Sequence, residues 1–371
     1  MPKLTVDTIG VALDMFGCPN RCRHCRLGRA TGGTLSEDDL GWVVEQFRDF
    51  QRERAGEPPW RAMHVSTWAR EPDYSDDYGH LYELERELSD LPSFRPVRGL
   101  LSIWRLARDV GYAEWAYDIG MRVCQLAFFG LEKATDWGHR RQGAFQDLLV
   151  ATERLLAAGI LPRWQWCFTK LLIPDLPGLI QLAEELQLRE RCEALGGSAA
   201  IFLHCPSPEG EAFRLEHLRP VERDLDRVPA WLREESEQHF SRSVVVPERD
   251  LVSSYLEDED PMATSVGDLT SGPGGLCFQV EPSFDLHPYM REITPRFRLG
   301  NLKRDGLARC LDAFEEDRAP GLQALFHVPV SELARRFGRP RGRRLYYPWD
   351  LKLRWARMWV DAECGGAGPG E

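Results

Sequence analysis

Over the first two hundred residues, short apolar runs typical of strands alternate with segments whose apolar residues recur at helical spacing. Short runs rich in apolar and β-branched residues predict strands at 5–16, 62–68, 100–106, 123–130, 163–168 and 198–205. Between these runs, apolar residues recur at helical spacing, as in Leu40, Val43, Val44 and Phe47, where Ser36 and Asp39 form a predicted capping box. Alternating strands and helices predict an α/β fold with parallel strands and outer helices. Six strands would form a partial (β/α)6, TIM-like barrel whose site lies at the carboxyl ends of the strands.

The alternation stops near residue 222. Residues 223–265 are charged and predicted to be an irregular connecting segment, and the acidic run EDED lies at 257–260. We therefore expect a barrel at 1–222, a smaller α+β extension at 266–330 and an arginine- and aromatic-rich tail at 331–371. For the tail we expect a C-terminal helix with a charged outer face.

Composition is that of an ordinary globular protein. The chain has 371 residues, 43% of them hydrophobic and 28% charged, with a net charge of −11. No apolar run has the length of a membrane span, and the N-terminus lacks an apolar signal core, so we expect a cytoplasmic protein without a membrane partner. The acidic net charge makes nucleic acid an unlikely partner.

Three cysteines lie within eight residues, Cys18, Cys22 and Cys25, directly after the first predicted strand. Their C-x3-C-x2-C spacing supplies three thiolates, one fewer than a closed tetrahedral site requires, which indicates an iron–sulfur cluster with one open iron. A structural zinc site with His24 or a remote fourth ligand is the alternative, although adjacent His24 and Cys25 would reach one ion with difficulty. Unliganded thiols are the third possibility.

The triplet and its position resemble the signature of radical S-adenosylmethionine (SAM) enzymes. The resemblance implies one 4Fe-4S cluster that binds SAM through its open iron. It also implies a one-electron cleavage of SAM to methionine and a 5′-deoxyadenosyl radical, which takes a hydrogen atom from the substrate. An electron donor of the flavodoxin or ferredoxin type is then a partner, and because such donors are acidic, the arginines of the tail are one candidate docking patch.

Several further residues resemble SAM contacts of that family. Glu71, followed by Pro72, keeps half of a Gly-Gly-Glu-Pro turn whose glutamate holds the SAM amino group. After the strand at 123–130, Glu132 is a candidate for the ribose hydroxyls, and Arg140 and Arg141 are candidates for a carboxylate. The alternative is that these charges lie at a helix end and face water.

On the strand at 163–168, Arg163, Gln165 and Cys167 alternate with two tryptophans, so the polar set shares one face. If that face lines the barrel, Arg163, Gln165 and the strand-end residue His204 bind substrate. Cys167 and Cys205, together with His204, are the weak catalytic candidates, with a thiol as hydrogen-atom donor. A buried cysteine is more often a small apolar residue.

The segment from Cys277 to Leu302 resembles the SPASM or twitch extension of radical SAM enzymes, but Phe284 replaces a turn glycine and Tyr289 replaces a cysteine. We therefore expect a degenerate extension without an auxiliary cluster. Too few residues precede Cys18 for a peptide-leader domain, so a small-molecule substrate is expected first and a ribosomal peptide second. A zinc-stabilised interaction protein is the alternative outside enzymes.

Overall fold

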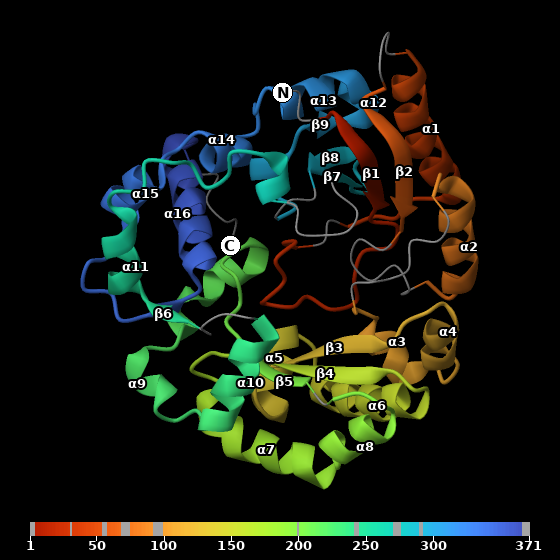
Figure 1. Ribbon diagram of the computed structural model, residues 1–371. Helices are drawn as coiled ribbons and strands as arrows, with labels where there is room; N and C mark the ends of the chain where they lie inside the picture. The colour runs from red at the N-terminus through yellow and green to blue at the C-terminus, as the bar shows by residue number, and fades with distance from the viewer. Residues whose placement is uncertain are drawn as a thin grey trace.

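The structure is a computed structural model, and it describes residues 4–29, 32–53, 58–67, 75–91, 99–198, 200–240, 245–269, 276–288 and 292–365. Two sheets lie on opposite sides of the molecule's centre, one in the upper and one in the lower half of Figure 1. Helices cover the outer face of each sheet. The mixed α/β class with parallel strands is therefore confirmed.

The upper sheet has the strand order β2-β1-β7-β8-β9. Its strands are β1 (Val6–Leu13), β2 (Trp60–Ser66), β7 (Leu276–Val280), β8 (Asp285–Pro288) and β9 (Gly300–Asn301). β1 pairs in parallel with both β2 and β7, and β8 and β9 continue the sheet in antiparallel pairing. A strand from the predicted extension is thus hydrogen-bonded directly to the first strand of the chain.

The lower sheet is entirely parallel and has the order β3-β4-β5. Its strands are β3 (Val123–Phe128), β4 (Leu161–Cys167) and β5 (Ala200–His204). A separate antiparallel pair joins β6 (Val246–Pro247) to β10 (Leu345–Tyr346). The strands predicted at 5–16, 62–68, 123–130, 163–168 and 198–205 are confirmed by β1 to β5.

The strand predicted at 100–106 is wrong, because helix α3 (Ile103–Arg108) begins inside it. The Ser102 side chain caps this helix by accepting a hydrogen bond from the Arg105 amide at 3.2 Å. Leu100 is 49% exposed, so the apolar run is not continuously buried as a central strand would be. A helix cap here outweighs the local β propensity. Among the described residues no strand joins β2 to β3, so the arc of parallel strands is interrupted.

The helices fall into three groups by position in Figure 1. Those beside the lower sheet are α3, α4 (Tyr112–Asp118), α5 (Glu132–His139), α6 (Ala144–Ala157), α7 (Leu176–Glu185), α8 (Leu188–Ala194) and α10 (Ala230–Phe240). Those beside the upper sheet are α1 (Glu37–Glu53), α2 (Tyr78–Leu88), α12 (Leu302–Asp305) and α13 (Leu307–Glu315). The others are α9 (Glu222–Leu225), α11 (Glu248–Tyr255), α14 (Pro320–Phe326), α15 (Val330–Phe337) and α16 (Pro348–Glu363). Short 3-10 turns are η2 (Ile173–Asp175), η3 (Gly210–Leu218), η4 (Val266–Asp268) and η5 (Pro295–Phe297).

The predicted capping box at α1 is confirmed. The Ser36 amide donates to the Asp39 carboxylate and the Asp39 amide donates to the Ser36 hydroxyl, both at 3.1 Å. None of the helices in the described ranges is long and apolar enough to cross a membrane.

Residues 223–265 are not irregular, because they contain α10 and α11. Helix α10 packs on β5 through Ser236, whose hydroxyl accepts a hydrogen bond from the Leu203 amide at 2.9 Å. The C-terminal helix expected in the tail is α16, and Leu351 and Trp355 bury its inner face. Although residues 223–265 are rich in charge, the apolar residues on one face of each helix are enough to pack that helix against the protein.

Two apolar cores hold the molecule together. One joins β1, β2 and α1 to β7, α13 and α16, and the other joins β3, β4 and β5 to α3, α6 and α7. Residues near the two ends of the chain thus share one core. The division into 1–222, 223–265, 266–330 and 331–371 stays a prediction.

Phe284 has a φ of 65°, the left-handed conformation that the glycine of the resembled turn would adopt without strain. Its ring is 8% exposed, lies 5.6 Å from the Trp42 ring and has the Lys303 Nζ atom 3.4 Å from its centroid. Loss of a buried Phe ring costs about 3–5 kcal/mol, whereas left-handed backbone costs about 1–2 kcal/mol. Packing therefore outweighs strain at this turn.

We expect Phe284→Ala to lower the free energy of unfolding by about 3 kcal/mol or more, because it removes the ring and keeps the strain. Phe284→Gly removes both, so its loss should be smaller by about 1 kcal/mol. Urea denaturation of the two variants measures this difference. A glycine variant less stable than the alanine variant would show that the backbone at this position is unstrained.

Candidate functional site

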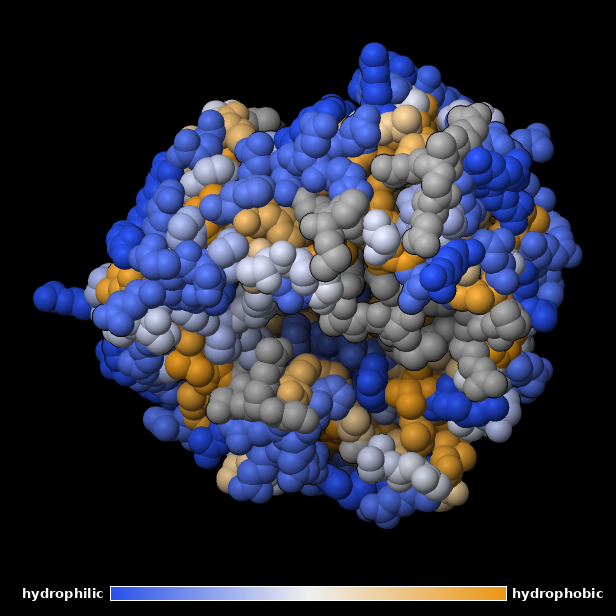
Figure 2. All heavy atoms as spheres, turned by 45° about the horizontal axis from the view of Figure 1, so that its top comes forward, coloured by the Kyte–Doolittle hydropathy of each residue, from blue (hydrophilic) through white to orange (hydrophobic). Residues whose placement is uncertain are grey.

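The inner faces of the two sheets are polar. On β4, Trp164 and Trp166 are fully buried in the outer core, and the Trp164 Nε1 atom donates to Thr152 of α6 at 3.1 Å. Because side chains alternate along a strand, Arg163, Gln165 and Cys167 face the other way, as the sequence predicts. Figure 2 shows a hollow with hydrophilic residues between the two halves of the molecule. We call the space that these β4 side chains face the lumen.

Amide side chains form a short chain of hydrogen bonds in the lumen. Gln125 of β3 donates through Nε2 to the Gln165 Oε1 atom at 2.6 Å, and Gln165 Nε2 lies 3.9 Å from the Cys167 Sγ atom. The Arg163 Nη2 atom reaches Gln125 Oε1 at 3.4 Å. Hydrogen bonds between neighbouring strands thus fix the orientation of the Gln125 and Gln165 side chains in the lumen.

The loop with the three cysteines follows β1, as expected. Cys18, Cys22 and Cys25 are partly buried and form no disulfide. The loop begins at Gly17, whose φ is 71° and whose amide donates to the Asp14 carboxylate at 3.1 Å. We call residues 17–28 the cysteine loop.

One side of the cysteine loop is held by α5. The Arg23 amide donates to the Gly138 carbonyl at 2.7 Å, and the Arg141 Nε atom donates to the Asn20 side chain at 2.7 Å. The Cys22 Sγ atom lies 3.3 Å from Nδ1 of His139. These contacts bring the loop to the carboxyl end of β3, from which α5 follows.

His139 has a defined role towards Cys22. Its Nε2 atom lies 2.9 Å from the Ala127 carbonyl, which can only accept, so Nε2 carries a proton. Burial lowers the pKa of His139, which favours the neutral ring. Nδ1 is therefore an acceptor, and the Cys22 thiol donates to it.

His24 points into the molecule. Its ring centroid is 5.1 Å from that of Phe129 and 5.6 Å from that of His139. Burial, together with the neighbouring imidazoles of His139 and His204, lowers the pKa of His24 to about 3. His204 ends β5, so the cysteine loop covers the carboxyl ends of both β3 and β5.

The other side of the cysteine loop is held by segments that follow β5 and β8. The Glu211 amide donates to the Cys25 carbonyl at 3.0 Å, and the Ile293 amide donates to the Leu27 carbonyl at 3.0 Å. Gly210 has a φ of 52°, and a Cβ added there would lie 2.5 Å from the Cys25 carbonyl oxygen. Only glycine permits this approach.

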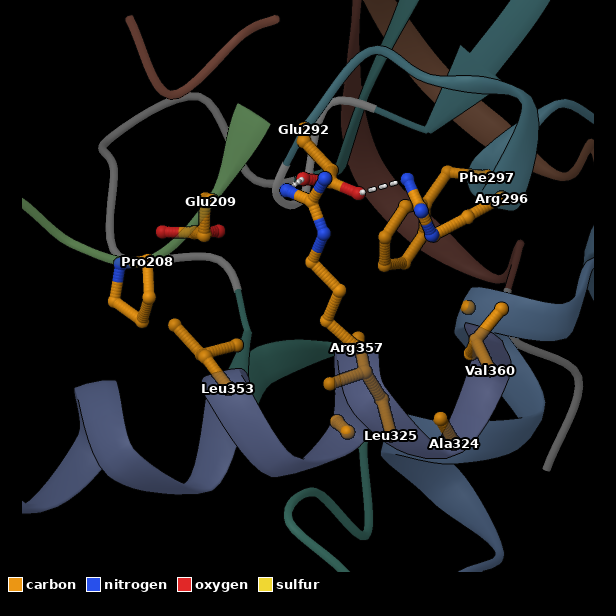
Figure 3. A pocket seen from close by; sticks show the side chains of 12 residues that line it. Pro208, Glu209, Glu292, Arg296, Phe297, Ala324, Leu325, Leu353, Arg357 and Val360 are labelled. Carbon is orange, nitrogen blue, oxygen red and sulfur yellow. Dashed lines mark hydrogen bonds and ion pairs between the residues drawn. The ribbon is translucent and has the colours of Figure 1, made fainter. Parts of the chain in front are cut away.

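Helix α16 supports this second contact through Arg357. Figure 3 shows Arg357 extending from α16 to Glu292, with Arg296 on the other side of the carboxylate. Arg357 Nη1 donates to the Gly210 carbonyl at 2.8 Å and lies 3.2 Å from Glu292, which is 3% exposed. The cavity beside them has a volume of about 30 Å³, about one water.

The donor set of the cysteine loop is three thiols, the ligand type that iron–sulfur clusters use. The His24 ring packs against the Phe129 ring. In the described part of the chain, no three or more His, Cys, Asp or Glu side chains are arranged around a common point. A cluster would therefore have to gather the three thiolates, and a preformed four-ligand zinc site does not exist among these residues.

The predicted SAM contacts lie in different places. Glu71 and Tyr289 are outside the described residues. Glu132 is exposed in the first turn of α5 and lines an open depression with Lys133 and Asp136. Arg140 pairs with Glu211 at 3.3 Å, and Arg141 contacts Asn20 and Asp147, so both arginines support the cysteine loop and its surroundings. Their proposed contacts with SAM stay predictions.

The two candidate thiols differ in environment. Cys167 faces the lumen side and packs with Ala127 and Phe129, whereas Cys205 belongs to the outer core and lies 3.5 Å from the Phe168 carbonyl. Burial raises the pKa of each thiol to about 12. Cys205 therefore lies in the apolar core as a small apolar residue, which is the alternative to a hydrogen-atom donor given in the sequence analysis.

Sequence reasoning did not assign roles to His139, Gly210, Glu292 or Arg357. Their partners lie far away in the chain, at a separation of 117 residues for Cys22 and His139 and 147 for Gly210 and Arg357. No periodicity links such positions. The only local signal was the turn-forming Pro-Glu-Gly stretch at 208–210.

No protein-family model matches the sequence, and no curated protein is similar to it. Solved structures are similar over most of the chain. The structure of native anSMEcpe with bound AdoMet and Cp18Cys peptide has a TM-score of 0.48 and 13% identity, covering 96% of this chain and 99% of that one. Streptococcus suis SuiB bound to precursor peptide SuiA has a TM-score of 0.44 and 12% sequence identity, and the match covers 92% of this chain and 75% of that one. HydG, a maturase of the [FeFe]-hydrogenase, has a TM-score of 0.35 and 14% sequence identity, and the match covers 65% of this chain and 52% of that one.

The first of these structures contains AdoMet and a peptide, and the second contains a precursor peptide. All three TM-scores are below 0.5, so we draw no argument about this chain from them. The function proposed below rests on the residues of this chain.

We expect Arg357→Met to destabilise the protein by about 3 kcal/mol, because it leaves the buried Glu292 carboxylate without its nearest cation. It should also lower the iron bound per chain after reconstitution, since Arg357 supports Gly210 against the cysteine loop. Urea denaturation and iron analysis measure the two effects. Arg336→Met is the matched control, because Arg336 pairs with Glu363 at the surface with 41% and 45% of the side chains exposed, and such pairs contribute under about 1 kcal/mol. Equal behaviour of the two variants would contradict the supporting role of Arg357.

Proposed function

We propose that this protein is a radical SAM enzyme in which Cys18, Cys22 and Cys25 hold one 4Fe-4S cluster. The observation that carries the proposal is three cysteines outside disulfides in one loop, which lies at the carboxyl ends of β3 and β5 beside the lumen. Such a cluster, when bound and reduced, supplies the electron that cleaves SAM and so generates the radical that takes a hydrogen atom from substrate. We assign the binding and orientation of SAM and substrate to side chains of this protein.

The chain supports this chemistry by position and by exclusion of water. His24 of the cysteine loop packs its ring against Phe129 at a centroid distance of 5.1 Å, so an apolar contact lies on the inner side of the loop. Glu71, Glu132, Arg140 and Arg141 remain the proposed SAM contacts, and Gln165, Arg163 and His204 the proposed substrate contacts. Any thiol hydrogen donor would be Cys167, because it faces the lumen side and its raised pKa of about 12 keeps the S–H hydrogen in place.

The proposed architecture is an interrupted barrel. The parallel strands β2, β1 and β7 form one wall and β3, β4 and β5 form the other. α3 replaces the strand that would bridge β2 and β3. This arrangement supports an incomplete TIM-like barrel with a site at the carboxyl strand ends.

A single cluster is proposed, because the remaining cysteines of the C-terminal half lie apart from one another. The Cys277 Sγ atom lies against Gly10 of β1, and the Cys310 Sγ atom against Gly300 of β9. Burial raises the pKa of Cys310 to about 11, which opposes the thiolate that a metal requires. These environments support a degenerate extension.

The proposed electron donor is an acidic protein of the flavodoxin or ferredoxin type. The arginines of the tail are largely ion-paired, with Arg335 on Glu259, Arg336 on Glu363 and Arg344 on Glu216. Arg21, Arg26 and Arg29 are exposed on or beside the cysteine loop. We therefore place the docking surface at the loop, where electron transfer has the shortest path.

The proposed substrate enters the hollow seen in Figure 2. A ribosomal peptide is proposed as the first candidate, in place of the small molecule expected from the sequence. A small molecule is the second candidate.

We expect anaerobically reconstituted protein to bind about four irons per chain and to form 5′-deoxyadenosine from SAM after reduction. Changing Cys18, Cys22 and Cys25 together to Ala should abolish the cluster absorbance and this product. A variant with Cys277 and Cys310 changed to Ala is the control and should keep both. Tightly bound zinc without iron, or a cluster that survives the triple change, would overturn the proposal.

A further inference from the structure

The most buried arginines of the described residues have carboxylate partners. Arg105 pairs with Asp76 at 3.0 Å, Arg219 with Glu216 at 3.1 Å, Arg354 with Glu216 at 3.3 Å and Arg357 with Glu292 at 3.2 Å. This pairing is expected, because burial of a guanidinium without an anion is costly. Arg163, which is partly buried, has no such partner among these residues.

Arg163 lies on β4 with its Nε atom buried and without a hydrogen-bond partner. Its Nη2 atom makes a long contact of 3.4 Å to the Gln125 side chain, which is neutral. No ion pair of Arg163 exists with any carboxylate of the described residues. Burial lowers the pKa of the guanidinium, as expected where no anion offsets the loss of water.

The surroundings hold this guanidinium in place. A Cβ added at Gly99 would lie 3.0 Å from Arg163 Nη2, and Gly99 has a φ of 59°, so a glycine leaves room for the guanidinium. Gln125 is itself fixed by its 2.6 Å hydrogen bond to Gln165. The nearby titratable and charged groups are Cys124 and His239, and neither is an anion at neutral pH. The site is oriented, cationic and without a counter-charge.

We propose that Arg163 binds an anionic group, a carboxylate or phosphate, of the molecule that occupies the lumen. A guanidinium suits both groups because it donates two parallel hydrogen bonds to either. This assignment names a feature of the substrate and therefore rests on the proposed function for its catalytic meaning.

The position of Arg163 also sets the length of the substrate. Arg163 is four residues before Cys167, which ends β4, and a strand rises about 3.3 Å per residue. The anion would thus be bound about 13 Å from the strand end where the cysteine loop lies. A substrate anchored at Arg163 and reacting at the loop must be elongated, with its charge at the end remote from the reacting carbon.

The test measures anion binding directly and needs no SAM cleavage. Thermal unfolding and titration calorimetry are done with inorganic phosphate, with succinate, and with triglycine and its C-terminal amide, for the wild type, Arg163→Met and Arg163→Lys. The control is Arg61→Met, since the Arg61 side chain is 79% exposed and pairs loosely with Asp7 at 3.8 Å. Circular dichroism checks that each variant is folded.

At least one anion should raise the unfolding temperature of the wild type and of Arg61→Met, and Arg163→Met should bind it at least tenfold more weakly. Without anion, Arg163→Met should unfold at a slightly higher temperature than the wild type, because a partly buried charge without a counter-ion has been removed. Arg163→Lys should retain part of the binding. Preference for phosphate or for the free over the amidated peptide identifies the anion.

Equal binding by wild type and Arg163→Met, or no binding of any anion by the wild type, would overturn the assignment. Repeating the titration on the variant lacking Cys18, Cys22 and Cys25 separates this proposal from the previous one. The triple variant should still bind the anion. If the wild type also fails to load iron, the anion site would be supported and the radical SAM function rejected.

Discussion

The cysteine loop depends on backbone hydrogen bonds to distant parts of the chain, because it contains no helix or strand of its own. The Gly138 carbonyl and the Glu211 and Ile293 amides bind it from two sides. A buried amide or carbonyl left without a partner costs about 1–3 kcal/mol, so these contacts determine the path of the loop. Gly210 lies so close to the Cys25 carbonyl that a side chain there would displace the loop, so this contact also determines the path of the loop. The thiols are therefore placed by the fold as a whole, including α16 through Arg357.

The polar lumen follows from a second constraint. Each sheet has one face in an apolar core, so the alternate residues of every strand must face inward. Along β4 these inward residues are Arg163, Gln165 and Cys167, which do not form an apolar filling. Gln125 and Gln165 satisfy each other, but the guanidinium has no anion. A folded protein tolerates such an uncompensated group mainly where function requires it, which is why we assign it a ligand.

Charge is distributed unevenly over an acidic protein. Arginines of the tail are largely bound to carboxylates of the same chain, so their positive charge is mostly offset locally. Arg21, Arg26 and Arg29 lie exposed on or beside the cysteine loop, a stretch whose printed sequence contains no acidic residue from 17 to 29. The cysteine loop is therefore an arginine-rich stretch on the surface of an acidic protein.

The sequence by itself determined the features that depend on local patterns. Strands β1 to β5, the capping box at Ser36, the alternation of tryptophans with polar residues on β4 and the thiol triplet after β1 were all predictable, because neighbouring residues specify them. Tertiary structure decided the rest. Residues 103–108 became a helix because Ser102 caps it and Asp76 pairs with Arg105. β7 joined β1, His139 reached the cysteine loop and Arg357 reached Gly210 beside that loop. These contacts join residues more than a hundred positions apart, which no local periodicity encodes.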